Sequence, residues 1–228
     1  MRPLISRGVL TGFGNGSILP ETKLTRGQFA AMVAKAFNGA NLRASAKFWD
    51  VPATFWGAVA IDRAYRMGFL AGFPDGSFRP NVNLTRAQAL VALVNGLRLT
   101  GGTASDLVRY ADQARIPSFA RTAISTATQR RLVVNYPDLS YLNADRDSSR
   151  AEVAAFMYQA LVSLNQLPAL NSPYIVNPSA SFTTPATSPG PSQAAAVAAS
   201  SFKSAEISAE PSANPAPDLP RPDLANTG

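Results

Sequence analysis

Two segments of the 228-residue chain align with each other without a gap, at a spacing of 60 residues. Residues 8–20 match residues 68–80, and the match continues from residues 24–28 to residues 84–88. A third, more divergent copy covers residues 135–152, at offsets of 63 and then 64 residues from the second copy. A period of this length is typical of folds built from repeated supersecondary units. The repetition therefore limits the fold more than any other feature of the chain.

Each copy contains a turn followed by a helix start. In the second copy, Pro74-Asp75-Gly76 is typical of a tight turn, because Pro fixes φ, Asp bonds nearby backbone and Gly tolerates positive φ. After each turn, a Thr or Ser precedes a Gln or Glu by three residues, which is the spacing of a capping box. The three pairs are Thr25 with Gln28, Thr85 with Gln88, and Ser149 with Glu152.

The segments after these caps have apolar residues at helical spacing. The three stripes are Phe29, Val33, Ala36 and Phe37; Leu90, Leu93, Val94 and Leu97; and Val153, Phe156, Met157, Ala160, Leu161 and Leu164. Three equivalent helices with narrow apolar stripes are most simply buried against one another, as a central three-helix bundle. A further helix precedes the turn in the second and third copies. The first copy has only seven residues before Gly8, so we expect its first helix to be missing.

The composition excludes several classes of chemistry. With no His and no Cys, the chain has no imidazole base, thiol nucleophile or common zinc site. A sugar-cleaving site needs two acids at a defined separation. Glu152 fits a capping role, and Glu21 is the only other Glu in the repeat region. Asp145 and Asp147 fit a solvated loop. The turns also lack the alternating acids of a calcium loop. We expect no enzymatic activity, no metal and no cofactor.

The charge distribution raises a second hypothesis, binding of nucleic acid or of polyanions in general. Residues 1–167 contain 19 basic and 10 acidic residues, and the sequence pI is about 10.1. The basic residues are nevertheless scattered, with one adjacent pair at Arg130-Arg131, and the helices are rich in Ala. A recognition helix would need polar side chains that reach the bases. We therefore expect no specific nucleic-acid partner.

The composition changes after residue 167. Residues 168–228 contain 11 of the 18 prolines and are otherwise mostly Ala, Ser, Thr and Asn, which is typical of a disordered tail. Within it, residues 172–176 are apolar enough to dock on the repeats as a short segment. The predicted organisation is repeat 1 at residues 1–39, repeat 2 at 40–100, repeat 3 at 101–167 and the tail at 168–228.

The repeated residues resemble the S-layer homology (SLH) domain. That family has an aromatic-Asp-Val opening, a Trp-bearing helix, a Gly-x-x-x-Gly-Phe/Tyr-x-Asp-Gly-x-Phe-x-Pro loop, and Thr-Arg-Ala-Glu before its last helix. Repeat 2 matches nearly throughout, and repeat 1 matches from Gly8 to Phe37. Repeat 3 is degenerate, because Asn135 replaces the second Gly of the loop and Leu139 replaces the Gly after Asp138.

The resemblance implies an all-α module of three repeats with pseudo-threefold symmetry, which binds polysaccharides attached to peptidoglycan, often pyruvylated ones. The Arg of the Thr-Arg-Ala-Glu motif is a principal ligand residue in that family, and it maps to Arg26, Arg86 and Arg150. We expect Arg86 to be the main one, acting beside free N–H groups at the helix start as an anion pocket. The candidate polysaccharide-binding residues are Arg26, Arg86, Arg150, Gly12, Gly72, Trp56, Asp75, Gln28 and Gln88.

Alternatives remain for several of these residues. Each Arg can instead pair with an acid such as Asp75 or Asp138, Trp56 can be a core residue, and Asp75 can serve only the turn. The family implies a module that acts as a monomer at the bacterial cell envelope. No transmembrane helix or secretion signal is visible, so this location assumes that Met1 is internal to a longer protein whose signal lies upstream.

Overall fold

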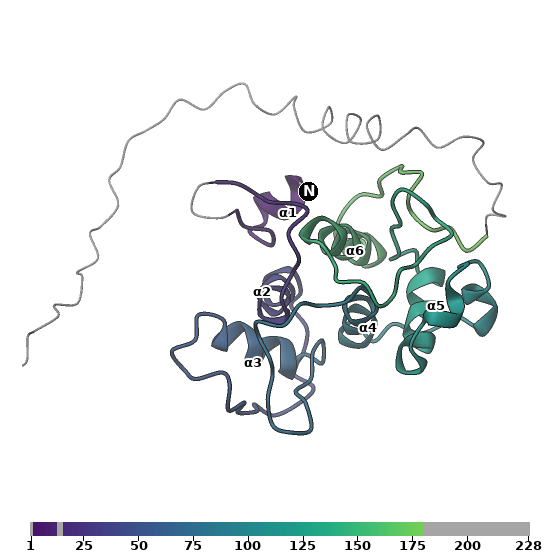
Figure 1. Cartoon of the computed structure of the whole chain (residues 1–228). Helices are drawn as coiled ribbons and strands as arrows, with labels where there is room; N and C mark the ends of the chain where they lie inside the picture. Colours follow the sequence, from purple (N-terminus) through teal and green to yellow (C-terminus); the bar gives the residue numbers. More distant parts are fainter. Residues whose placement is uncertain (1, 13–15, 180–228) are drawn as a thin grey trace, which may run out of the picture. The chain divides into compact units, whose positions relative to one another are not determined.

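The computed structural model describes residues 2–12 and 16–179, and these residues form a helical protein (Figure 1). In chain order the elements are α1 (Arg2–Ser6), α2 (Arg26–Ala36), α3 (Ala58–Arg66), α4 (Arg86–Gly96), η1 (Ala104–Leu107), η2 (Gln113–Arg115), η3 (Ser118–Ala120), α5 (Arg121–Gln129) and α6 (Arg150–Ser163). Within the described ranges, extended backbone pairs only as isolated bridges and forms no sheet. The predicted all-α class is confirmed.

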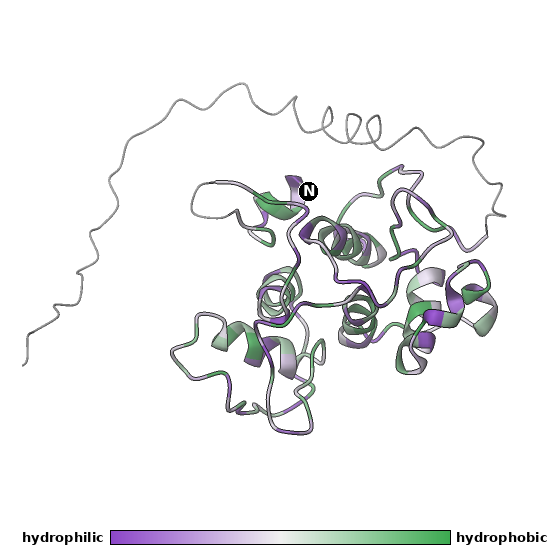
Figure 2. Ribbon diagram, in the orientation of Figure 1, coloured by the Kyte–Doolittle hydropathy of each residue, from purple (hydrophilic) through white to green (hydrophobic). Residues whose placement is uncertain are grey.

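Helices α2, α4 and α6 begin where the capping boxes place them. In each, the Thr or Ser side chain accepts a hydrogen bond from the third helical N–H, and the Gln or Glu at that position accepts one from the cap N–H. Their apolar faces are buried, and apolar residues from all three repeats form one core. Figure 1 views the three helices close to end-on, and Figure 2 shows the apolar residues that they carry.

The three repeats are joined by a closed ring of backbone hydrogen bonds just before these helices. The Leu84 N–H donates to Leu24 O (2.9 Å), the Leu24 N–H to Ser148 O (3.0 Å), and the Ser148 N–H to Leu84 O (2.8 Å). These residues are related by the offsets of 60 and 64 that the sequence repeats predict. Separating any two repeats would therefore break backbone hydrogen bonds. The three-helix bundle with pseudo-threefold symmetry itself stays a prediction.

The first helix of repeats 2 and 3 packs on the second helix of the repeat before it. Helix α3 contacts α2, and α5 contacts α4. Repeat 1 retains a short helix, α1, whose Leu4 is buried. Leu4 O accepts from the N–H groups of Val9 and Leu10, as Ala64 O does from Phe69 and Leu70 in repeat 2. The expectation that repeat 1 lacks its first helix is therefore corrected, since the last turn of that helix is present.

The Asp of the aromatic-Asp opening holds the loop of its repeat. The Asp50 carboxylate accepts hydrogen bonds from the N–H groups of Phe78 (2.8 Å) and Arg79 (2.6 Å). Asp112 does the same for Leu142 (2.9 Å) and Asn143 (2.7 Å) in repeat 3. Arg79 and Asn143 both have positive φ, so each carboxylate fixes an unfavourable backbone conformation in place. The loops of repeats 2 and 3 thus keep their shape through a contact distant in sequence.

The start of the expected tail is ordered against repeat 3. The Asn135 N–H donates to Tyr174 O (3.0 Å), the Val176 N–H donates to Val133 O (2.9 Å), and the side chains of Ile175 and Val176 are buried. This confirms the docking of residues 172–176 and corrects the assignment of residues 168–179 to a disordered tail. Residues 180–228 lie outside the described part of the chain. None of the described helices has the length and apolar character needed to cross a membrane.

Candidate ligand-binding grooves between the repeats

The three motif arginines all reach into the loop of the following repeat. In each case Nε and Nη2 donate to two backbone carbonyls of that loop. The acceptors are Ala71 and Phe78 for Arg26, Val134 and Leu142 for Arg86, and Thr11 and Ile18 for Arg150. Repeat 1 therefore contacts repeat 2, repeat 2 contacts repeat 3, and repeat 3 contacts repeat 1. Each arginine thus links two repeats by hydrogen bonds and also places a positive charge beside a loop.

These arginines are deeply placed but remain charged. Their exposed fractions are 6% for Arg26, 2% for Arg86 and 6% for Arg150. Loss of hydration lowers the pKa of all three guanidinium groups. A guanidinium nevertheless stays protonated in proteins, because its ordinary pKa lies so far above neutrality. The loop carbonyls accordingly surround a permanent positive charge.

The helix starts do not supply free N–H groups beside these arginines. The N–H of Arg26 donates to Val82 O (2.9 Å), and that of Gly27 donates to Pro80 O (2.8 Å). The first two N–H groups of α4 and α6 donate in the same way to carbonyls of residues 144–146 and 20–22. The capping boxes satisfy the third N–H. The predicted anion pocket made by free N–H groups is therefore wrong, and any anion must be held by side chains.

Four predicted site residues meet in one groove, here called groove 1. Gly12 and Gln28 of repeat 1, Trp56 of repeat 2 and Arg150 of repeat 3 line a hollow of about 180 Å³. Trp56 is 64% exposed, so it is not a core residue. All three repeats contribute to this groove, which is why no single copy of the motif contains a complete site.

A second hollow of about 240 Å³, here called groove 2, is built in the same way one repeat later. Gly72 and Gln88 belong to repeat 2, Arg26 comes from repeat 1, and Phe119 comes from repeat 3. Phe119 is 65% exposed and lies 63 residues after Trp56, the offset between repeats 2 and 3. The sequence reasoning did not select Phe119, although that offset aligns it with Trp56.

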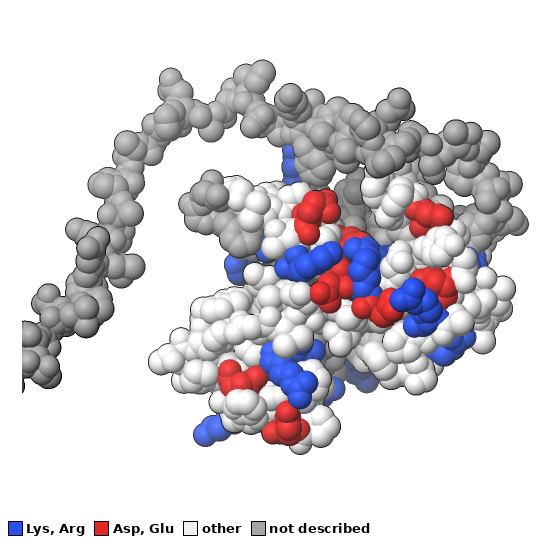
Figure 3. Space-filling model, in the orientation of Figure 1, with Lys and Arg blue, Asp and Glu red and all other residues white. Residues whose placement is uncertain are grey.

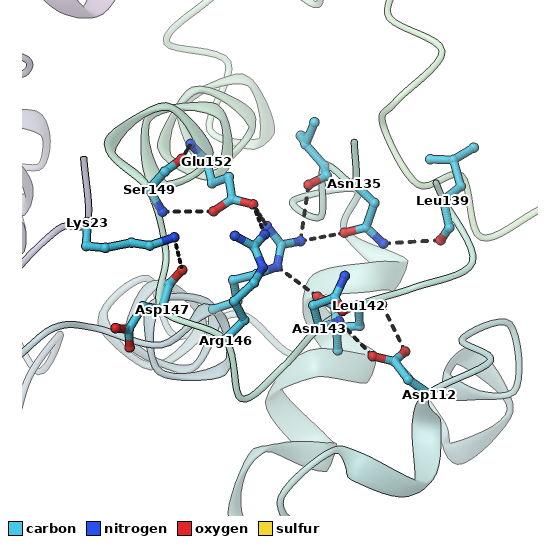
Figure 4. A network of polar contacts seen from close by, with 12 residues as sticks. Lys23, Asp112, Asn135, Leu139, Leu142, Asn143, Arg146, Asp147, Ser149 and Glu152 are labelled. Carbon is cyan, nitrogen blue, oxygen red and sulfur yellow. Dashed lines mark hydrogen bonds and ion pairs between the residues drawn. The ribbon is translucent and has the colours of Figure 1, made fainter. Parts of the chain in front are cut away.

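The equivalent region of repeat 3, here called groove 3, has different chemistry. Arg86 Nη1 donates to Glu152 (2.8 Å) and Nη2 to the Asn135 side chain (2.6 Å), so Arg86 is satisfied inside the protein. Figure 4 shows Glu152, Asn135 and Arg146 in this network. The residues around the remaining hollow of about 150 Å³ include Val134, Tyr158 and Ile175 and no cation.

The structure therefore does not favour Arg86 as the main ligand residue. Its acidic partner is Glu152, rather than Asp75 or Asp138. Burial acts to raise the Glu152 pKa, but the Arg86 charge, the Ser149 N–H and Arg146 together lower it below its ordinary value. Groove 3 is also the one without the loop glycine, because Asn135 occupies that position and uses its amide oxygen to hold Arg86.

The loop glycines have a packing reason of their own. A Cβ at Gly72 would lie 2.3 Å from the Phe48 ring, and one at Gly12 would lie 3.1 Å from the carbonyl oxygens of Gly16 and Ser17. A side chain at either position would therefore disturb the loop that forms the groove wall.

Asp75 lines neither groove. Its carboxylate accepts hydrogen bonds from Ser77 and Arg79 within the turn. The Ser77 hydroxyl, the Arg79 guanidinium and the Ser77 N–H lower the pKa of Asp75 to about 2. These contacts indicate that Asp75 stabilises the turn and favour this role over ligand binding.

The described residues contain no group of three or more acids that could hold a metal ion. Basic and acidic side chains are intermingled on the face shown in Figure 3, which does not fit the single-sign stripe of a nucleic-acid interface. Grooves 1 and 2 instead combine a buried cation, an exposed aromatic ring and amide groups. The fold and these grooves define a helical repeat protein with open grooves between its repeats.

Residues 1–30 and 47–90 match the family model of the S-layer homology domain. The chain therefore carries S-layer homology domains, which are non-catalytic binding modules, as the loop and capping motifs predicted. The match does not extend to repeat 3, where the loop motif is degenerate.

Several curated proteins are similar to this chain. Cell surface glycoprotein 1 of Acetivibrio thermocellus is 30% identical over 68% of this chain and 7% of its own length. The cellulosome-anchoring protein of the same organism is 27% identical over 67% of this chain and 35% of its own length. The surface-layer 125 kDa protein of Lysinibacillus sphaericus is 24% identical over 78% of this chain and 15% of its own length. The chain thus spans a minor part of these relatives.

Proposed function

We propose that this chain is a non-catalytic module that attaches a protein to the bacterial cell wall by binding an anionic polysaccharide linked to peptidoglycan. The observation that carries the proposal is groove 1, where Arg150, Trp56, Gln28 and Gly12 meet although they come from three repeats. The family match and the names of the relatives, a cell surface glycoprotein and an anchoring protein among them, support a role at the cell envelope.

The residues of the groove suit a charged sugar. A guanidinium binds a carboxylate through charge-assisted hydrogen bonds, which are about twice as strong as neutral ones. An exposed indole offers an apolar face on which a sugar ring can stack, at little cost in conformational entropy. A pyruvate ketal places a carboxylate directly on a sugar ring, so a pyruvylated polysaccharide would present both features together. Gln28 supplies a polar group beside them.

Two grooves, rather than three, carry this function. Groove 2 repeats the arrangement with Arg26, Gly72, Gln88 and Phe119, whereas the cation of groove 3 is neutralised by Glu152. Two sites on one module allow a repetitive polymer to be held at two points at once, which raises the apparent affinity without new contacts. The module would act as a monomer in this arrangement.

The test is co-sedimentation of the chain with native bacterial wall and with wall whose attached polymers have been removed by acid. We expect binding to native wall only. Trp56→Ala should weaken it about tenfold through loss of stacking, with the melting temperature unchanged because Trp56 is exposed. Trp49→Ala is the matched control, since Trp49 is also exposed but lines neither groove.

Equal binding to native and stripped wall would contradict the proposal and point to nonspecific charge. An equal loss from Trp56→Ala and Trp49→Ala would contradict the assignment of the site. A double variant of Trp56 and Phe119 should lose more affinity than either single variant, because both attachment points are weakened.

A further inference from the structure

The third residue of the second helix differs in kind between the repeats. It is Gln28 in α2 and Gln88 in α4, which line grooves 1 and 2, and it is Glu152 in α6. All three side chains accept a hydrogen bond from the N–H of their own helix cap through one oxygen. The other polar atom of the side chain is an N–H donor in Gln and an acceptor oxygen in Glu.

In groove 3, the carboxylate of Glu152 divides its two oxygens between the helix cap and the motif arginine. Oε2 accepts from the Ser149 N–H (2.8 Å; Figure 4), and Oε1 accepts from Arg86 Nη1 (2.8 Å). Arg146 also donates to Oε1. A side chain at this position can therefore reach the arginine of the preceding repeat while it still caps its own helix.

In groove 2, Gln88 uses its amide oxygen for the cap. Oε1 accepts from the Thr85 N–H (3.1 Å), and because that N–H can only donate, the atom that faces it must be the oxygen. The amide nitrogen Nε2 makes no hydrogen bond with any residue that the structure describes. Gln88 thus brings an unused donor to the groove wall.

The motif arginine of groove 2 has no carboxylate partner within the described ranges. Arg26 Nε and Nη2 donate to loop carbonyls, and Nη1 makes no hydrogen bond with a described residue. Desolvation and then the Arg79 charge lower the pKa of Arg26, and the Asp50 charge opposes them. Asp50 itself accepts from two loop N–H groups and forms no ion pair with Arg26.

We propose that Gln88 is a specificity-determining residue of groove 2, which keeps Arg26 available to an anionic sugar and donates through Nε2 to the same anion. The alignment of Gln88 with Glu152 puts Nε2 beside Arg26 Nη1, so two donors face one position where groove 3 has a donor and an acceptor. A ligand carboxylate supplies the missing acceptor. A Glu at this position would instead occupy the arginine, as Glu152 does.

This inference rests on the proposed function and deepens it, because it names the residue that makes a groove accept or reject an anion. The test compares Gln88→Glu with Gln88→Ala in the full chain. The probe is a monosaccharide with one carboxylate-bearing ketal, and its methyl ester is the neutral reference. Calorimetry reports grooves 1 and 2 together. The change in Trp fluorescence on binding reports groove 1, which Trp56 lines.

We expect Gln88→Glu to weaken binding of the carboxylate at groove 2 by about tenfold or more, because the new carboxylate competes for Arg26. Gln88→Ala should weaken it by only about threefold, because one donor is lost and Arg26 stays available. The fluorescence titration of groove 1 should be the same in both variants. A residue that served only the helix cap would give the opposite order, since Ala removes the cap contact and Glu keeps it.

The melting temperatures check the proposed pairing without ligand. Gln88→Glu should raise the melting temperature, because the buried guanidinium of Arg26 gains a carboxylate and the capping box is kept, as it is with Glu152 in α6. Gln88→Ala should lower it, because the cap N–H loses its side-chain acceptor. Gln166→Glu is the matched control, since Gln166 is exposed and lines none of the three grooves.

The inference is overturned if Gln88→Glu binds the carboxylate as the wild type does, or if Gln88→Ala loses more affinity than Gln88→Glu. Equal effects of Gln88→Glu and Gln166→Glu would also overturn it. A wild-type chain that binds the acid no more tightly than the methyl ester would count against the proposed function itself. A wild type that prefers the acid, with no effect of Gln88→Glu, would leave the proposed function standing and remove only the role of Gln88.

Discussion

At the scale of single residues, the position of the motif arginine in the first helical turn is explained only by the folded protein. The first turn of a helix is a poor place for a positive charge, because the helix dipole is positive at that end. Arg26, Arg86 and Arg150 are stabilised there by pairs of loop carbonyls from the next repeat. Two of them keep access to an open groove, whereas Arg86 is fully used inside the protein. The partner of Arg86 is Glu152 at the third position of α6, where α2 and α4 have Gln28 and Gln88.

A residue-scale prediction concerns Arg131. It has φ of 59°, at the position where repeats 1 and 2 have Gly8 and Gly68 with φ of 65° and 83°. A side chain in this conformation costs roughly 1 kcal/mol. Its side chain is exposed, so Arg131→Gly should raise the stability by several tenths to about 1 kcal/mol, measured by urea denaturation. Gly68→Ala should lower it by a similar amount, and a lower stability for Arg131→Gly would refute the explanation.

At the scale of elements, α4 and α6 are linked by the Arg86–Glu152 ion pair. Glu152→Gln removes its charge but keeps the capping box, because Gln28 and Gln88 fill the same position in repeats 1 and 2. We expect a loss of roughly 2 kcal/mol at pH 7, the contribution of a hydrogen bond between charged groups. Thermal unfolding of both proteins would measure it. An unchanged stability would mean that Arg86 is satisfied by carbonyls and Asn135 alone.

The same pair gives a prediction about pH. The pKa of Glu152 is lowered in the folded protein, so the pair contributes fully above the ordinary glutamate pKa of 4.5 and is lost as pH falls through the lowered value. The wild-type chain should therefore lose more stability below pH 4.5 than Glu152→Gln does. The difference between their melting temperatures should shrink on acidification. A difference that does not depend on pH would contradict the assignment.

At the scale of the whole molecule, the segment after α6 completes the core of repeat 3. Val176 is fully buried, and Arg109 donates to the carbonyls of Asn177 and Pro178 at 2.6 Å each. Val176→Asp would bury an unpaired charge, so we expect it to cost at least 2 kcal/mol in denaturant unfolding. Leu170→Asp in the same segment should change little, because Leu170 is exposed. Similar behaviour of the two variants would mean that the segment does not contribute to the core.

The sequence by itself determined the repeats, the capping boxes and the helical class, because these depend on residues a few positions apart. It also identified the motif arginines, Gly12, Gly72 and Trp56 as site candidates through the family resemblance. Only the tertiary structure decided which of them meet. Groove 1 joins residues from three repeats, Phe119 completes groove 2, and Glu152 and Asn135 neutralise Arg86 across more than 45 residues of sequence. Such contacts depend on how the repeats pack, and no local pattern specifies which partner lies beside a buried charge.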